Sequence, residues 1–151
     1  MSIVIELHRQ ELPPEIKQAI MMPLDDFTRQ QGHVWSPTTF SLVLVDSAGH
    51  VQGGLFGEIL WEWLRVSILS VTEACRGQGL GRRLMTEAEQ VAREAGGHSA
   101  WVDTFSFQAP DFYPKLGYVE FARLADFPRG ASRIFFRKSL IAELSQKDPA
   151  E

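Results

Sequence analysis

The chain has 151 residues, of which 44% are apolar and 23% charged, the balance of one globular domain rather than of a disordered or fibrous protein. Its formal net charge of −4 at pH 7 argues against a nucleic-acid partner, because phosphate backbones attract basic surfaces. The single cysteine, Cys75, excludes an internal disulfide and any zinc or iron–sulfur site that needs several thiolates.

The start of the chain predicts one strand and a helical region. Residues 3–7 are rich in β-branched side chains, which favour a strand. Apolar residues at helical spacing follow Pro14, and proline is tolerated in the first turn of a helix but not in its interior. Pro14 therefore marks a helix start, and Pro23 a break or kink. The sequence shows no basic-then-apolar leader and no apolar stretch of membrane-spanning length, so we expect a cytoplasmic protein without a membrane partner.

Three strands are predicted next. Residues 40–45 and 51–60 flank a turn-forming tetrad at residues 46–49, a pattern typical of a β-hairpin. Three glycines inside the second of these runs indicate a bulge or a close approach of the backbone. Residues 64–71 are expected to form the third strand, which ends just before a glycine-rich segment.

A long amphipathic helix is predicted after that segment. From Leu80 onward, apolar residues recur at offsets of four, eight, eleven, twelve and fifteen positions, so they share one face of a helix that stops at Gly96. Glu89 and Arg93 lie four residues apart, and we expect this pair on the solvent side of the helix.

The rest of the chain predicts a short helix among three strands. The strands are expected at residues 101–105, 118–124 and 133–140, and the short helix at residues 110–116. Residues 1–145 are then expected to form a single mixed α/β domain, followed by a frayed tail at residues 146–151.

The glycine-rich segment Arg76-Gly77-Gln78-Gly79-Leu80-Gly81 lies at a junction from strand to helix. Alternating glycines let the chain turn tightly, and the first turn of a helix leaves about four N–H groups unpaired, so such a junction binds phosphate oxygens. Arg82 and Arg83 add positive charge. The alternative is a glycine-rich turn without a ligand. A Walker A loop would end in Gly-Lys-Ser/Thr and a Rossmann fingerprint would read G-x-G-x-x-G, and both fit this segment poorly.

Two motifs together resemble one family. The segment Val71-x-x-x-x-Arg76-Gly77-x-Gly79-Leu80-Gly81-x-x-Leu84 resembles the acetyl-CoA pyrophosphate loop of the GCN5-related N-acetyltransferases (GNAT). The segment Ala109-x-x-Phe112-Tyr113-x-x-x-Gly117-Tyr118 resembles the second signature of that family. The resemblance spans residues 40–140, and the closing segment resembles a subgroup of small bacterial members. It implies a GNAT fold, in which about four helices flank a central, mostly antiparallel and twisted sheet of about six or seven strands with splayed middle strands.

The resemblance also implies an activity, the direct transfer of an acetyl group from acetyl-CoA to a primary amine. A small-molecule amine is favoured over a protein, because the chain has no basic tail or spare domain to hold a macromolecule. The residues implied in binding the cofactor are Leu69, Ser70, Val71, Arg76, Gly77, Gln78, Gly79, Leu80, Gly81, Arg82 and Ser106. Ser106 departs from the family pattern, which often has asparagine there.

The implied catalytic groups are a tyrosine and a carboxylate. Tyr113 would act as general acid on the cofactor sulfur, whereas the alternative is that it only packs beside Phe112. The general base is least determined. Asp103, on a strand that faces the cleft, and Glu58 are the two chosen candidates; Glu62, Glu73 or a chain of waters are the others. We expect no metal site, because the four histidines lack metal-ligand spacing.

Other functions stay open at this stage. A non-catalytic acyl-CoA sensor would keep the glycine loop but would not need Tyr113, which favours an enzyme. A protein or peptide N-acetyltransferase and a dinucleotide-binding oxidoreductase are further alternatives. The tryptophans Trp35, Trp61 and Trp63 are read either as a wall of the acceptor pocket or a cation cage, or as packing in the core or in a homodimer.

Overall fold

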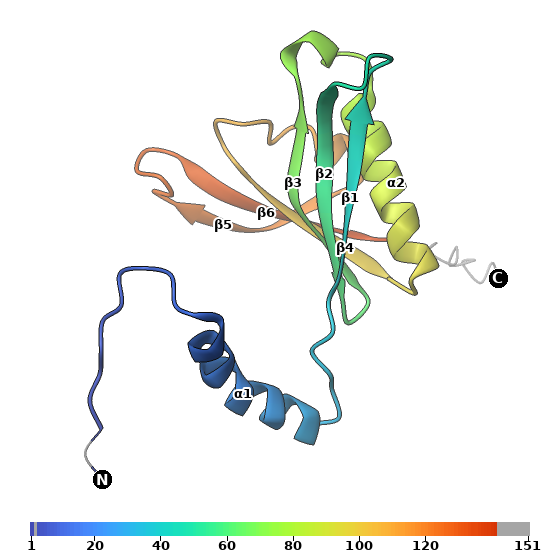
Figure 1. Cartoon of the computed structure of the whole chain (residues 1–151). Helices are drawn as coiled ribbons and strands as arrows, with labels where there is room; N and C mark the ends of the chain where they lie inside the picture. Colours follow the sequence, from blue (N-terminus) through green and yellow to red (C-terminus); the bar gives the residue numbers. More distant parts are fainter. Residues whose placement is uncertain (2, 142–151) are drawn as a thin grey trace, which may run out of the picture. The chain divides into compact units, whose positions relative to one another are not determined.

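The computed structural model describes residues 1 and 3–141, and the chain divides into two units, Met1–Ser36 and Pro37–Glu151 (Figure 1). The tail expected at residues 146–151 lies outside the described residues. Its fraying, and a single domain over residues 1–145, therefore stay predictions. No helix among the described residues combines the length and the apolar character needed to cross a membrane.

The first unit contains one long helix, α1 (Pro14–Gln30). Pro14 begins the helix as expected, because a proline in the first turn forfeits no helical hydrogen bond. The helix then continues through Pro23, which has no N–H to bond the carbonyl of Ala19. Of the break or kink expected there, the break is not found, and a kink stays a prediction. Within this unit, residues 3–7 form no strand.

The second unit is built on one six-stranded sheet in the order β1-β2-β3-β4-β6-β5. Its strands are β1 (Thr38–Val45), β2 (Val51–Leu60), β3 (Trp63–Val71), β4 (Ser99–Phe105), β5 (Val119–Ala125) and β6 (Ser132–Ser139). Neighbouring strands are antiparallel except β3 and β4, which are parallel. The mixed α/β class and the mostly antiparallel sheet are thus confirmed, and each of these strands lies within two residues of its expected bounds.

The number of helices differs from the expectation. Among the described residues there are two α-helices, α1 and α2 (Leu80–Glu94), and two short 3₁₀ helices, η1 (Glu73–Cys75) and η2 (Pro114–Leu116), so the expected count of about four α-helices is wrong. The helix expected at residues 110–116 shrinks to a turn and η2, because Gly117 takes a φ of 89° and ends it.

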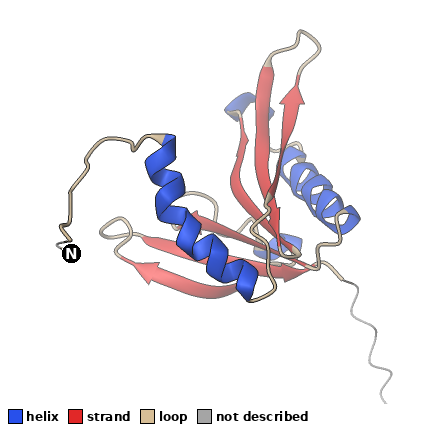
Figure 2. Cartoon of the chain, turned by 60° about the horizontal axis from the view of Figure 1, so that its bottom comes forward, coloured by secondary structure: helices blue, strands red, loops and turns tan. Residues whose placement is uncertain are grey.

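Helix α2 covers one face of the sheet and encloses the core with β2 and β3 (Figure 2). The helix contributes the buried residues Leu84, Met85, Ala88 and Ala92, and the sheet contributes Leu55, Ile59, Leu64, Val66, Ala100, Val102, Ile134 and Phe136. Because side chains alternate along a strand, Glu58, Arg65, Trp101 and Asp103 point to the opposite face of the same strands.

The sheet opens between its two parallel strands. Pairing of β3 with β4 is limited to Trp63–Val66 against Ser99–Val102. Beyond that point β3 stays paired with β2, and β4 stays paired with β6, so the two strands separate and leave backbone groups of both without a strand partner on the inner side. Figure 1 shows the result: β1–β3 run up the view while β5 and β6 run to the side. The expected splay of the middle strands is present.

Candidate active site

A cavity of about 1000 Å³ fills the opening between β3 and β4. Its lining comes from the separated ends of both strands, from the glycine loop with the start of α2, and from the segment that carries η2. Such a volume lies at the upper end of the range of about 300–1,000 Å³ for pockets that hold small molecules and cofactors. Of the residues implied in binding a cofactor, this cavity is lined by Leu69, Ser70, Val71, Arg76, Gly77, Gly79, Leu80, Gly81 and Arg82.

The glycine loop presents unpaired N–H groups to this cavity. Gly77 and Gly79 take φ values of 73° and 74°, which residues with a side chain rarely adopt. In the described part of the chain, no N–H from residue 77 to residue 82 donates to a backbone carbonyl. The first turn of α2 carries no acidic residue, and no side chain caps it. The loop and helix start are therefore free to bind an anion.

Glycine is needed at position 81 for a different reason. A Cβ atom added there would lie 3.3 Å from Cζ of Phe112, closer than ordinary van der Waals contact. Gly81 therefore lets the segment that precedes η2 pack directly against the start of α2. This contact brings the glycine loop and Tyr113 to the same cavity.

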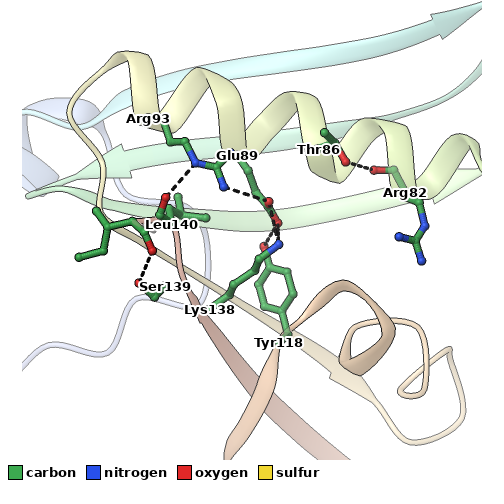
Figure 3. Close-up of polar contacts among 9 residues, drawn as sticks. Arg82, Thr86, Glu89, Arg93, Tyr118, Lys138, Ser139 and Leu140 are labelled. Atoms are coloured by element: carbon green, nitrogen blue, oxygen red, sulfur yellow. Dashed lines mark hydrogen bonds and ion pairs between the residues drawn. The ribbon is translucent and has the colours of Figure 1, made fainter. Parts of the chain in front are cut away.

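The arginines of the loop differ in their contacts. Nε of Arg76 donates to the carbonyl of Val71 at 3.2 Å, which ties the loop to the end of β3 and leaves its terminal nitrogens for a ligand. Arg82 lines the cavity, and Figure 3 shows its guanidinium extending away from the helix. The contact drawn for Arg82 is made by its backbone carbonyl, which accepts from Oγ1 of Thr86 at 3.0 Å.

Two implied cofactor-binding residues lie outside the cavity lining. Nε2 of Gln78 donates back to the carbonyl of Ala74 at 3.5 Å. Oγ of Ser106 accepts from the N–H of Ser132 at 3.0 Å, which fastens the end of β4 to the start of β6. Both residues therefore have hydrogen-bond partners within the protein and are absent from the lining.

Tyr113 both packs in the core and lines the cavity. Its ring meets Phe112 edge-on at 5.1 Å and Tyr118 at 6.0 Å, and only 7% of the residue is exposed. Burial, together with the negative charge of Asp103, raises the pKa of Tyr113 to about 12. The phenol therefore keeps its proton at neutral pH, which is the state a proton donor requires.

Asp103 also lines the large cavity, but its carboxylate is paired. Oδ2 of Asp103 accepts from Nε of Arg133 at 2.7 Å, and this bond raises the pKa of Arg133. The Arg133 guanidinium lies 5.3–5.6 Å from the ring centres of Phe105, Phe127 and Phe135. A base must take up a proton, and protonating Asp103 would break this ion pair. The arrangement therefore disfavours Asp103 as the base.

Glu58 lies in a separate, smaller cavity of about 260 Å³ on the sheet face opposite α2. Ser67 lines both cavities, at the point where β3 leaves β4. Neither Glu62 nor Glu73 lines either cavity, and Glu62 instead pairs with His98 at 3.7 Å. Trp61 and Trp63 are absent from both linings as well, so they do not wall these pockets.

A buried ionic cluster that contains Tyr118, the neighbour of Tyr113, was not predicted from the sequence. Glu89 is 5% exposed, and its carboxylate accepts from Nζ of Lys138 at 2.9 and 3.0 Å and from the hydroxyl of Tyr118 at 3.0 Å (Figure 3). The expected place of Glu89 on the solvent side is therefore wrong. The available signal was its position four residues after Met85 and three before Ala92, on the apolar face.

The comparisons with known proteins come to the same family. The sequence profile of the Acetyltransferase (GNAT) family matches residues 4–118, a stretch that includes the glycine loop and Tyr113. The chain belongs to the GNAT family. It is 43% identical over 93 residues to the blasticidin-S acetyltransferase of Streptomyces morookaense, a match that covers 61% of this chain and 68% of that protein.

Two further acetyltransferases match over most of their length. Acetyltransferase Atu2258 of Agrobacterium fabrum is 30% identical over 124 residues, 82% of this chain and 90% of that protein. The crystal structure of an acetyltransferase from Bacillus cereus superposes with a TM-score of 0.75 at 30% identity, over 88% of this chain and 97% of that one. Among the described residues, the GNAT domain holds no group of three or more histidine, cysteine or acidic side chains placed to bind a metal.

Proposed function

We propose that this GNAT protein transfers the acetyl group of acetyl-CoA directly to a primary amine on a small molecule. The observation that carries the proposal is one continuous cavity that runs from the glycine loop, through the gap between β3 and β4, to Tyr113. A phosphate-binding end, a strand edge and a protonated phenol are what a bound acyl-CoA thioester requires along its length. Acetyl-CoA would supply the activated acetyl group.

Each part of the cavity has a separate task in this proposal. The N–H groups of residues 77–82, that of Gln78 included, and the charges of Arg76 and Arg82 bind the pyrophosphate. The free edge of β3 at Leu69, Ser70 and Val71 pairs with the pantetheine amides as an added strand would. Ser106 has no task here, because its hydroxyl is bonded to Ser132.

Three proton transfers complete the reaction. The acceptor must lose a proton from its ammonium group before the nitrogen can attack the thioester carbonyl. Glu58 is the better placed of the two carboxylates, since Asp103 is bound to Arg133. Tyr113 then donates its proton to the departing thiolate, and the second proton lost by the nitrogen as the amide forms restores the phenol.

A small-molecule acceptor is supported by the relative named for its action on blasticidin S, at 43% identity. The alternatives are a protein or peptide N-acetyltransferase and an acyl-CoA sensor without turnover. The sensor is disfavoured by the placement of a protonated tyrosine in the cavity, which binding alone does not need.

The test is a release assay for free thiol, with acetyl-CoA, a panel of small amines and a parallel set of lysine peptides. We expect thiol release and an N-acetylated product with at least one class of small amine. Calorimetric titration should show acetyl-CoA binding below about 1 mM, the upper range of enzyme substrate constants. Binding without turnover on every amine would point to the sensor, and turnover on peptides alone would overturn the small-molecule acceptor.

A further inference from the structure

The smaller cavity on the face opposite α2 carries two opposite charges that do not neutralise each other. Glu58 of β2 and Arg65 of β3 are direct cross-strand neighbours and both line it. Within the described residues, however, neither forms an ion pair. The Arg65 guanidinium instead lies over the ring of Trp101, 5.1 Å from its centre. A carboxylate and a guanidinium are thus held side by side and unpaired.

Arg65 also has a donor without an acceptor. Its Nε is a buried nitrogen with no hydrogen-bond partner, and it is the one buried side-chain polar atom of this kind among the described residues. A buried hydrogen-bond donor without an acceptor destabilises the fold, so most such groups in proteins have a hydrogen-bond partner. Because Arg65 lines this cavity, its guanidinium remains available for an acceptor that a ligand brings.

The smaller cavity adjoins the gap between β3 and β4 that is proposed to hold acetyl-CoA. In the pairing of β2 with β3, Phe56 faces Ile68 and Gly57 faces Val66, so Ser67 is the extra residue of a bulge. Ser67 is also the first residue of β3 beyond its pairing with β4. Because Ser67 lines both cavities, a molecule in the smaller one abuts the gap proposed to hold the thioester.

We propose that the smaller cavity binds the acceptor, and that the acceptor is a small zwitterion whose amine and carboxylate are a few bonds apart, as in an amino acid. This inference rests on the proposed acetyl transfer and adds the class of acceptor to it. Glu58 binds the ammonium group and takes its first proton, while the unpaired guanidinium of Arg65 binds the carboxylate. The amine nitrogen then forms the amide bond as the C–S bond breaks, and the thiolate takes its proton from Tyr113.

The size and charge of the cavity disfavour other amines. Side chains on directly opposed residues start about 4.5–5.5 Å apart, which fits an amine and a carboxylate separated by a few bonds. A polyamine would bring positive charge against Arg65. The side chain of a lysine in a peptide has no carboxylate near its amine. A volume of about 260 Å³ is also smaller than a typical site for a drug-sized ligand.

The experiment compares matched acceptors with the wild-type protein. Each L-amino acid is assayed by thiol release beside its amide and its decarboxylated amine, with a polyamine and lysine peptides in parallel. We expect at least one free amino acid to exceed both of its matched analogues by about 100-fold in kcat/KM, because a site built for a polar group discriminates strongly against its absence. Equal rates within each matched set, or a preference for polyamines or peptides, would overturn the inference.

Two variants test whether Arg65 causes the preference for an acceptor with a free carboxylate. Arg65→Gln should remove the advantage of the free carboxylate while the dissociation constant of acetyl-CoA, measured by calorimetry, stays unchanged. Arg137→Gln is the matched control, because Arg137 lies on the same face, next to Trp101 on β6, and lines neither cavity. Loss of the preference in both variants would contradict the role of Arg65. Failure of the wild type to bind acetyl-CoA would instead overturn the proposed function, so the two failures are distinguishable.

Discussion

At the scale of single residues, the protonated state of Tyr113 is set by its surroundings. Burial and the charge of Asp103 raise its pKa to about 12, so the phenol is a proton donor throughout the physiological range. Tyr113→Phe should lower kcat by about 100-fold, as expected for loss of a general acid, with little change in acetyl-CoA affinity. Thiol-release kinetics and calorimetry measure the two quantities. A parallel loss of affinity and rate would show that Tyr113 acts only through packing.

The same pKa predicts how stability depends on pH. Tyr113 and Tyr118 both have pKa values raised by burial, so the folded protein retains their protons at a pH where the unfolded chain releases them. Their contribution to stability is complete below about pH 10 and declines as the pH rises from 10 toward 12. Urea unfolding at pH 8 to 11 should show this decline, and it should be shallower in Tyr113→Phe. An equal slope in that variant would contradict the assignment.

Arg82 and Arg83 offer a matched pair on one helix turn. Arg82 lines the large cavity and Arg83 does not. Arg82→Ala should weaken acetyl-CoA binding by about 10- to 150-fold, since a hydrogen bond to a charged group contributes about 1.5–3 kcal/mol. Arg83→Ala should leave the calorimetric dissociation constant nearly unchanged. Equal effects of the two variants would indicate a diffuse charge effect rather than a defined contact.

Glu58 and Asp103 are distinguished by their effects on rate and on stability. Glu58→Gln should lower kcat by about 100-fold with acetyl-CoA affinity unchanged, because it removes the base. Asp103→Asn should change kcat far less but lower the free energy of unfolding by about 2 kcal/mol, since it breaks the charged hydrogen bond with Arg133. A loss of rate in Asp103→Asn alone would reverse the assignment of the base.

At the scale of elements, Glu89 joins α2 to β6 and to the start of β5. Its carboxylate bonds Lys138 and Tyr118 in a buried setting (Figure 3). Replacing Lys138 leaves the buried Glu89 carboxylate with only the longer ion pair to Arg93 at 3.8 Å, so Lys138→Met should cost about 3 kcal/mol in urea unfolding. The double variant Glu89→Leu with Lys138→Met should recover much of this loss. Additive losses would contradict a coupled pair.

The elements of the second unit were predictable because local patterns agree with the tertiary structure. The hairpin of β1 and β2 follows its turn residues, and α2 follows its apolar spacing and begins at the glycine loop. The wrong predictions lie where the local sequence favours one structure and the described chain adopts another. Residues 3–7 have strand-forming side chains but form no strand within the first unit, and the helix continues through Pro23.

Only the part of the candidate site that is proposed to bind acetyl-CoA could be predicted from the sequence. The glycine loop and Tyr113 are local motifs, and both line one cavity. The ion pair of Asp103 with Arg133 joins residues 30 apart in the chain, and the bond of Ser106 with Ser132 joins residues 26 apart. The unpaired juxtaposition of Glu58 with Arg65 depends on strand register and on the stacking of Arg65 over Trp101. Such contacts leave no local pattern in the sequence.

At the scale of the whole second unit, the sheet opens between β3 and β4. The larger cavity lies in this gap, and the smaller cavity reaches the same gap at Ser67. Each strand beside the gap remains paired on its outer side, so the opening costs no further part of the sheet. A thioester in the gap and an amine in the smaller cavity would meet at the bulge of β3.

The most direct test of this account is an amide ¹H–¹⁵N map of the protein with and without acetyl-CoA. We predict the largest shifts at residues 77–82, whose N–H groups have no backbone acceptor, and on both sides of the gap at residues 69–71 and 102–104. The turn between β1 and β2 at residues 46–50, which lines neither cavity, should not respond. Absence of shifts at saturating acetyl-CoA, or shifts that leave the loop at residues 77–82 unaffected, would contradict the account.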